Sequence, residues 1–94
     1  MAGSLWVREI RRGRIRRDLV VPCPERDFEE ALREACRALD VGMPIVTDKH
    51  ARDFAAFSQA RFLPEHFMES ISFDRLEAEY FDTEANHARP PRED

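Results

Sequence analysis

Two runs that contain aromatic and β-branched side chains, residues 5–10 and 14–21, lie on either side of Gly13. Short runs of this composition that are bounded by turn residues are typical of β-strands. Glycine adopts the positive φ of a tight turn without steric cost, so it suits the point where two strands reverse direction. The pattern therefore predicts an N-terminal β-hairpin that turns at Gly13.

The register of this hairpin depends on the length of its turn, and the pattern is compatible with two lengths. With a two-residue loop at positions 12 and 13, the facing pairs are Ile10 with Ile15, Trp6 with Leu19, and Arg8 with Arg17. With a three-residue loop at positions 12 to 14, they are Val7 with Leu19, Leu5 with Val21, and Arg8 with Asp18. The first register places two like charges opposite each other, which destabilises a sheet.

Two amphipathic helices are predicted next. Residues 25–40 begin with acidic side chains that favour a helix N-terminus, and Gly42 is expected to end this helix. Its apolar side chains recur at three- and four-residue spacing, at Phe28, Ala31, Leu32, Ala35 and Leu39. A second helix is predicted from a cap at Thr47 or Asp48 to about Gln59. Its expected apolar face contains Ala51, Phe54 and Ala55, with Phe57 or Phe62 as a further member.

The remaining segments complete a small α+β domain. Residues 43–46 are an apolar connector or a minor strand, and Pro64 is expected to open one more helical turn, to residue 70. Apolar and polar side chains alternate in residues 71–81, which predicts a late strand, and a turn near Asp74-Arg75 remains an open alternative within it. The expected faces of this strand are Leu76, Ala78 and Tyr80 on one side and Glu77 and Glu79 on the other.

The expected fold is an antiparallel sheet of about three strands, the N-terminal hairpin plus the late strand, with two helices packed on one face. Residues 1–81 are assigned to this single domain, because a chain of 94 residues is too short for a second core. Residues 82–94 contain acidic residues and prolines but no large apolar side chain, and are predicted to form a disordered tail.

The formal net charge is −4, but the charge is unevenly distributed. Residues 1–20 contain six arginines against Glu9 and Asp18, a local charge of +4, which leaves −8 for residues 21–94. Clustered guanidinium groups attract phosphate, so this hairpin is a candidate site for anions or nucleic acid. The candidate binding residues are Arg11, Arg12, Arg14 and Arg16.

Two other roles for the basic hairpin remain open. Charged side chains at a strand edge oppose aggregation, so the arginines could serve only to protect the edge. They could also meet an acidic surface, either on another copy of the chain or on the strand that carries Glu77 and Glu79.

The sequence contains no motif for nucleotide binding or nucleophilic catalysis and no regular spacing of metal ligands. His50 and Asp53 lie one helical turn apart, which suits either a general base with its partner or an exposed polar helix face. An enzymatic role would require a pocket lined by His50 or His66. We expect no catalytic residue, metal, cofactor or small-molecule substrate.

The two cysteines, Cys23 and Cys36, show no CxxC spacing, so reduced thiols are expected. No apolar run reaches the about 18 residues that a membrane span needs, and the first residues do not resemble a secretory signal. The sequence therefore predicts a cytoplasmic protein without membrane contact.

Several short segments together resemble a group of short uncharacterised bacterial proteins, chiefly from Gram-positive genomes. These segments are Trp6, Arg12-Gly13-Arg14-Ile15, Arg17-Asp18, Asp40, Pro44-Ile45, Lys49-His50, Asp53-Phe54, Arg61-Phe62 and Phe73-Asp74-Arg75-Leu76-Glu77. The resemblance extends almost to Phe81 and implies a bacterial, cytosolic protein. It implies no activity, ligand or partner.

Seven phenylalanines and one tryptophan are a large aromatic content for so small a core, and some of them are expected at a binding surface. Together with the opposed charges, this content predicts a non-enzymatic protein that acts by protein-protein contact, as a homodimer or as an accessory subunit. The alternative is weak binding of nucleic acid or another anion by the arginine-rich hairpin.

Overall fold

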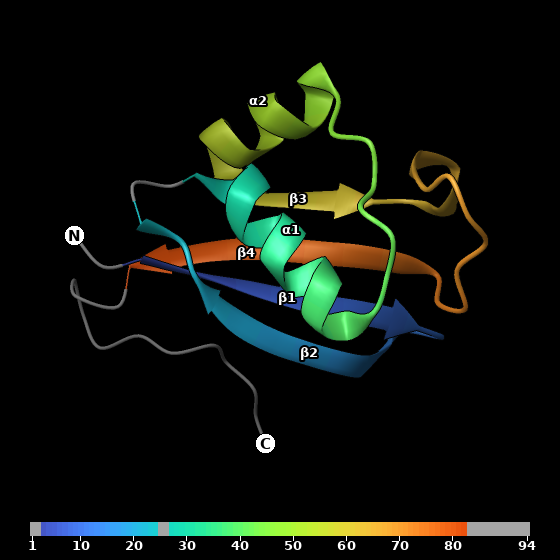
Figure 1. The fold of residues 1–94 in the computed structure, drawn as a ribbon. Helices are drawn as coiled ribbons and strands as arrows, with labels where there is room; N and C mark the ends of the chain where they lie inside the picture. Colours follow the sequence, from blue (N-terminus) through green and yellow to red (C-terminus); the bar gives the residue numbers. More distant parts are fainter. Residues whose placement is uncertain (1–2, 25–26, 83–94) are drawn as a thin grey trace.

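The computed structural model describes residues 3–24 and 27–82. In this part of the chain, four strands form one antiparallel sheet with the order β2-β1-β4-β3 (Figure 1). The strands are β1 (Gly3–Arg11), β2 (Arg14–Pro22), β3 (Gln59–Phe62) and β4 (Arg75–Asp82). The helices are α1 (Phe28–Leu39) and α2 (Asp48–Phe57), followed by a short 3-10 turn, η2 (Pro64–His66). The α+β prediction is confirmed, with four strands rather than about three.

The hairpin of β1 and β2 combines the two registers that the sequence leaves open. Its loop has two residues, Arg12 and Gly13, with φ angles of 56° and 76°. Ile10 faces Ile15, as predicted for a loop of two residues. A β-bulge then shifts the register, so that Arg8 faces Asp18 and not Arg17. The bulge thereby avoids the like-charge pair that an uninterrupted ladder would create.

The two central strands come from opposite ends of the described chain. β1 pairs with β4 along its length, from Gly3 opposite Asp82 to Ile10 opposite Arg75. Gly3 allows a close approach at the start of this ladder, because a Cβ at this position would overlap the ring of Tyr80 unless that ring moved. β2 and β3 are left as the two edges of the sheet.

Aspartates cap α1 at both ends. Asp27 accepts a hydrogen bond from the Glu30 backbone N–H, and Asp40 ends the helix with a φ of 61°. The prediction that Gly42 ends the helix is wrong, because Asp40 adopts the left-handed conformation two residues earlier. The predicted buried stripe is present with Cys36 added: Phe28, Ala31, Leu32, Ala35, Cys36 and Leu39.

α2 is shorter than predicted and buries a different face. Ser58 ends the helix with a φ of 61°, so Gln59 begins β3 instead of extending α2. The buried residues of α2 are His50 and Phe54, whereas Ala51 and Ala55, expected in the core, are exposed. The helix is therefore anchored by two aromatic rings and not by a continuous apolar stripe.

The core lies between the sheet and the two helices. The rings of Phe28 and Phe54 stack with their centroids 4.3 Å apart and join α1 to α2. Burying each such large apolar side chain contributes roughly 1.5–3 kcal/mol. β4 alternates as predicted, with Leu76 and Ala78 in this core and Glu77 directed to the opposite face.

Residues 43–46 are a connector without a strand, which is one of the two alternatives that the sequence left open. Other predicted boundaries need correction. η2 ends at His66, before the predicted residue 70. The late strand begins at Arg75, four residues later than predicted, and reaches Asp82. The rest of the predicted tail, residues 83–94, lies outside the described residues. No helix in the described part is long and apolar enough to cross a membrane.

Candidate functional site

The hairpin tip gathers three of the four candidate arginines. Arg11, Arg12 and Arg14 are all exposed, and Arg11 lies directly opposite Arg14 across the turn. Within residues 3–24 and 27–82, none of these three guanidinium groups has an ion-pair partner. Arg16 is also exposed, but its Nη1 donates a hydrogen bond to the Ser72 carbonyl oxygen at 3.1 Å.

The face of the sheet opposite the helices carries a row of alternating charges across all four strands. In the order β2, β1, β4 and β3, the row is Asp18, Arg8, Glu77 and Arg61. Arg8 Nε donates to Glu77 at 2.9 Å, and its Nη1 donates to Glu79 at 3.2 Å. Burial alone would raise the pKa of Glu77, but hydrogen bonds from Arg75 and Arg8 lower it below its ordinary value. One hairpin arginine is thus neutralised within the molecule.

Arg17 is used in a similar way on the helix-covered face. Its guanidinium donates two hydrogen bonds to the carboxylate of buried Glu9, at 2.9 and 3.2 Å. It also donates to the Leu39 carbonyl oxygen, at the end of α1, at 2.8 Å. The hydrogen bond and the charge of Glu9 raise the pKa of Arg17. This arginine therefore joins β2, β1 and α1.

The two histidines considered for catalysis line the same open groove. A groove of about 560 Å³ lies between α2, β3 and η2, and both His50 and His66 line it. Asp53 also lines the groove, but it accepts a hydrogen bond from Lys49 at 2.7 Å and is not paired with His50. Two apolar side chains at the rim of the groove, Phe57 and Leu63, are 68% and 40% exposed.

The two imidazoles cap the turns on which they lie. His50 Nδ1 accepts a hydrogen bond from the Thr47 backbone N–H at 2.9 Å, and His66 Nδ1 accepts one from Leu63 at 3.0 Å. In a neutral ring that accepts at Nδ1, the proton lies on Nε2. Burial and the neighbouring ring of His66, 4.6 Å away between centroids, lower the pKa of His50. His50 is therefore neutral at pH 7.

The groove runs along the free edge of β3. The Tyr80 N–H donates to the Ser58 carbonyl oxygen at 2.8 Å, and successive residues of an antiparallel strand direct their backbone groups to alternate sides. The backbone groups of Gln59 and Arg61 consequently point away from β4 and into the groove. A hydrogen bond between the side chain of His50 and the Arg61 backbone agrees with this direction.

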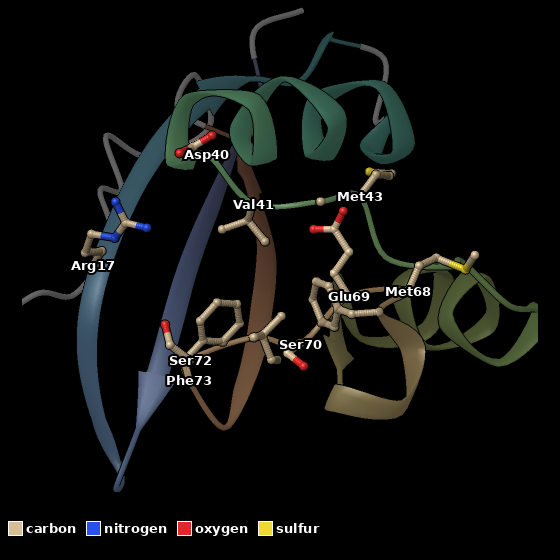
Figure 2. A pocket seen from close by; sticks show the side chains of 12 residues that line it. Arg17, Asp40, Val41, Met43, Met68, Glu69, Ser70, Ser72 and Phe73 are labelled. Atoms are coloured by element: carbon tan, nitrogen blue, oxygen red, sulfur yellow. The ribbon is translucent and has the colours of Figure 1, made fainter.

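A second, smaller depression of about 340 Å³ lies beside the end of α1 (Figure 2). Val41 and Phe73 provide apolar walls, while Arg17 stands on the side of β2 and Glu69 on the opposite side. Asp40 adds a second carboxylate. Because both signs of charge face the same space, this depression favours no single class of ligand.

The groove is not evident from the sequence, because the helical pattern that precedes it extends to Gln59, the first residue of β3. The available signal was short: Ala60 and Phe62 are buried and alternate with Gln59 and Arg61. Phe57 is the last residue of α2, which ends at Ser58. No glycine or proline near Ser58 indicates this end in the sequence.

The remaining reactive side chains form no further site in the described residues. Both cysteines are free and buried, and burial raises the pKa of Cys36 to about 11, so its thiol is protonated. Among the residues that the structure describes, no three metal-binding side chains lie together. In comparisons with known proteins, no family model, no curated protein and no solved structure matches this chain.

Proposed function

We propose that this domain acts without catalysis as a protein-binding module, and that an extended segment of a partner protein binds in the groove between α2 and β3. The observation that carries the proposal is the free backbone edge of β3 inside a groove of about 560 Å³. A peptide added to such an edge gains main-chain hydrogen bonds, and the flanking pockets select alternate side chains.

The backbone of β3 supplies the polar part of this site. Three backbone groups point into the groove: the N–H and the carbonyl oxygen of Gln59 and the N–H of Arg61. The carbonyl oxygen of Arg61 is not counted, because it accepts a hydrogen bond from the side chain of His50. Each main-chain hydrogen bond contributes about 0.5–1.5 kcal/mol net. Three such bonds align a segment but do not bind it tightly, so side chains must contribute as well.

Apolar side chains at the rim of the groove define which side chains the partner segment carries. Phe57 and Leu63 are 68% and 40% exposed, and covering each of them contributes roughly 1.5–3 kcal/mol. Arg61 lies between these two along the chain, but its Nε is 3.6 Å from Glu77 on the face of the sheet opposite the helices. The partner segment is therefore expected to present apolar residues at alternate positions.

We also propose a cytoplasmic location, which the free, buried cysteines support because oxidising compartments favour disulfides. The partner is either another protein or a second copy of this chain. Size-exclusion chromatography with light scattering separates these two cases. A dimer that the Arg61→Pro change converts to a monomer identifies self-association through β3, whereas a monomer at high concentration requires a different partner.

The experiment that tests the groove uses a display library of random ten-residue peptides, selected on the whole protein. Peptides are then titrated against two variants at one position. Arg61→Pro removes the N–H that points into the groove, and proline is tolerated at a strand edge. Arg61→Val removes the same side chain but keeps that N–H. We expect a loss of affinity of about 2- to 13-fold for the proline variant relative to the valine variant, which corresponds to one main-chain hydrogen bond.

Two exposed apolar residues provide the side-chain comparison. Phe57→Ser is expected to weaken peptide binding about 10- to 100-fold, because the ring no longer contributes its buried area. Met68→Ser alters a side chain that is 82% exposed beside the other depression, and is expected to have no effect. A library that yields no binder, or peptides that bind all four variants equally, would overturn the proposal.

A further inference from the structure

Three arginines occupy positions at the hairpin tip that the fold itself does not favour. Arg12 has a φ of 56°, a left-handed conformation in which asparagine and glycine are preferred. Arg11 and Arg14 face each other across the turn, where a pair of like charges opposes strand pairing. Each of the three positions would suit another residue better, so their shared charge points to a role outside folding.

The same fold neutralises the arginines that lie along the strands. Arg8 is bound by Glu77 and Glu79, and Arg17 is bound by Glu9. No such carboxylate partner is present for the three tip arginines in the described part of the chain. Strand arginines therefore serve the structure, whereas tip arginines remain open to an external anion.

The tip is both accessible and held in place. Nothing lies within 4 Å of the point where a Cβ on Gly13 would stand, so the turn projects into open space. From behind, Asp74 accepts a hydrogen bond from the Arg12 backbone N–H at 2.8 Å, and its own N–H donates to the Ile10 carbonyl oxygen at 2.7 Å. Arg16 is tied to Ser72 in the same loop. These hydrogen bonds hold the backbone of the turn that carries the guanidinium groups.

We propose that the hairpin tip is a second binding site, distinct from the β3 groove, and that it binds the phosphates of duplex DNA. A guanidinium group binds phosphate through two parallel hydrogen bonds, which a lysine cannot do. A two-stranded ribbon fits the major groove, so arginines on both sides of the turn reach the backbones that flank it. The residues assigned to the site are Arg11, Arg12 and Arg14, with Arg16 beside them.

The acidic character of the whole chain does not prevent this contact. The carboxylates at the start of α1 lie near the opposite end of β2 from the tip, which a strand of nine residues places roughly 25 Å away. At physiological salt the Debye length is about 8 Å, so charges at that distance are largely screened. Asp74 is close to the tip, but one carboxylate leaves most of the basic charge uncompensated.

Binding of the whole protein to a fluorescein-labelled DNA duplex, measured by fluorescence anisotropy at increasing salt, tests the proposal. Neutralising three to four phosphates predicts a slope of about −3 in a plot of log affinity against log salt, equivalent to a loss of about 40- to 150-fold between 50 and 200 mM. The triple variant Arg11→Gln, Arg12→Asn and Arg14→Gln should reduce the slope to about −1. Asparagine is chosen because it suits the left-handed turn.

A charge-matched control variant replaces three exposed helix arginines, Arg33, Arg37 and Arg52, by glutamine. It has the same net charge as the tip variant and is expected to bind the duplex within about twofold of the wild type. Vesicles that contain phosphatidylserine serve as a second anionic probe. The proposal is overturned if no duplex binding occurs at about 50 mM salt, if both variants lose affinity equally, or if only vesicles bind. Single changes at Arg11 and Arg14 replace the triple variant should it not fold.

Discussion

Replacing Arg12 by asparagine is expected to stabilise the protein, although the change removes a charge and adds no packing. The backbone holds Arg12 at a φ of 56°, which costs an ordinary residue about 1–2 kcal/mol. Asparagine adopts this conformation more readily and should recover about 0.5–1 kcal/mol of that cost. Relief of repulsion among exposed arginines adds about 0.3 kcal/mol. A total near 1 kcal/mol corresponds to a rise in Tm of roughly 4–8 °C for a domain of this size.

Thermal and urea unfolding, followed by far-UV circular dichroism, measure this change. Gly13→Ala is the matched control of opposite sign, because alanine at a φ of 76° is strained even where nothing lies within 4 Å. It should lower stability by about 1 kcal/mol or more. Arg14→Gln removes the same charge without changing the loop, so it isolates the electrostatic part, about 0.3 kcal/mol.

The result that refutes this reasoning is an Arg12→Asn protein no more stable than the wild type, with an unchanged urea m-value. An unchanged m-value would show that the denatured state is not responsible. The backbone conformation of the turn would then carry no cost, and the argument that Arg12 is retained for binding would lose its basis.

Three further predictions concern a titrating ring, a buried carboxylate and a close backbone approach. Because the pKa of His50 is lowered in the folded state, the unfolded chain takes up a proton first, and stability is lost as pH falls below about 6.5. His50→Gln keeps the helix cap, so its urea midpoint should lose less than that of the wild type between pH 7.5 and 5.5. Glu77→Ala leaves its arginine partners without their carboxylate and should cost about 2 kcal/mol in urea unfolding, whereas the more exposed Glu79→Ala should cost less than about 1 kcal/mol; equal losses would contradict the burial argument. Gly3→Ala pushes a methyl group into the Tyr80 ring and should cost about 1–3 kcal/mol, with a smaller loss when the same change is made in a Tyr80→Leu background.

The hairpin shows how far local pattern reaches. The strand-like composition of residues 5–10 and 14–21 and the position of Gly13 predicted two strands and their turn, and both are present. The register could not be predicted, because a bulge between Glu9 and Ile10 combines the two registers that the sequence allows. Arg17, opposite Glu9 in this register, also donates to the carbonyl oxygen of Leu39 at the end of α1, a contact that the hairpin sequence alone does not reveal.

The groove was hidden for a related reason. β3 has only four residues, too few for alternation to outweigh the helical pattern before it. Its importance comes from its place at the edge of the sheet, which is set by pairing with β4 and not by its own residues. The sequence suggests His50 and His66 as possible catalytic groups, but their Nδ1 atoms accept hydrogen bonds from the backbone N–H groups of Thr47 and Leu63. A single sequence does not reveal which hydrogen bonds a histidine ring makes.

The order of the strands also determines when this protein can fold. β1 lies in the centre of the sheet, but its neighbour β4 ends at Asp82, opposite Gly3, so the central ladder closes only after almost the whole described chain has left the ribosome. Until then the apolar side chains of Leu5 and Val7 belong to an open strand edge, which is the kind of surface on which nascent chains aggregate. Pairing over so long a sequence separation is also slow. During synthesis β1 can therefore pair with β2 as soon as both have emerged, whereas its pairing with β4 must wait for the end of the described chain.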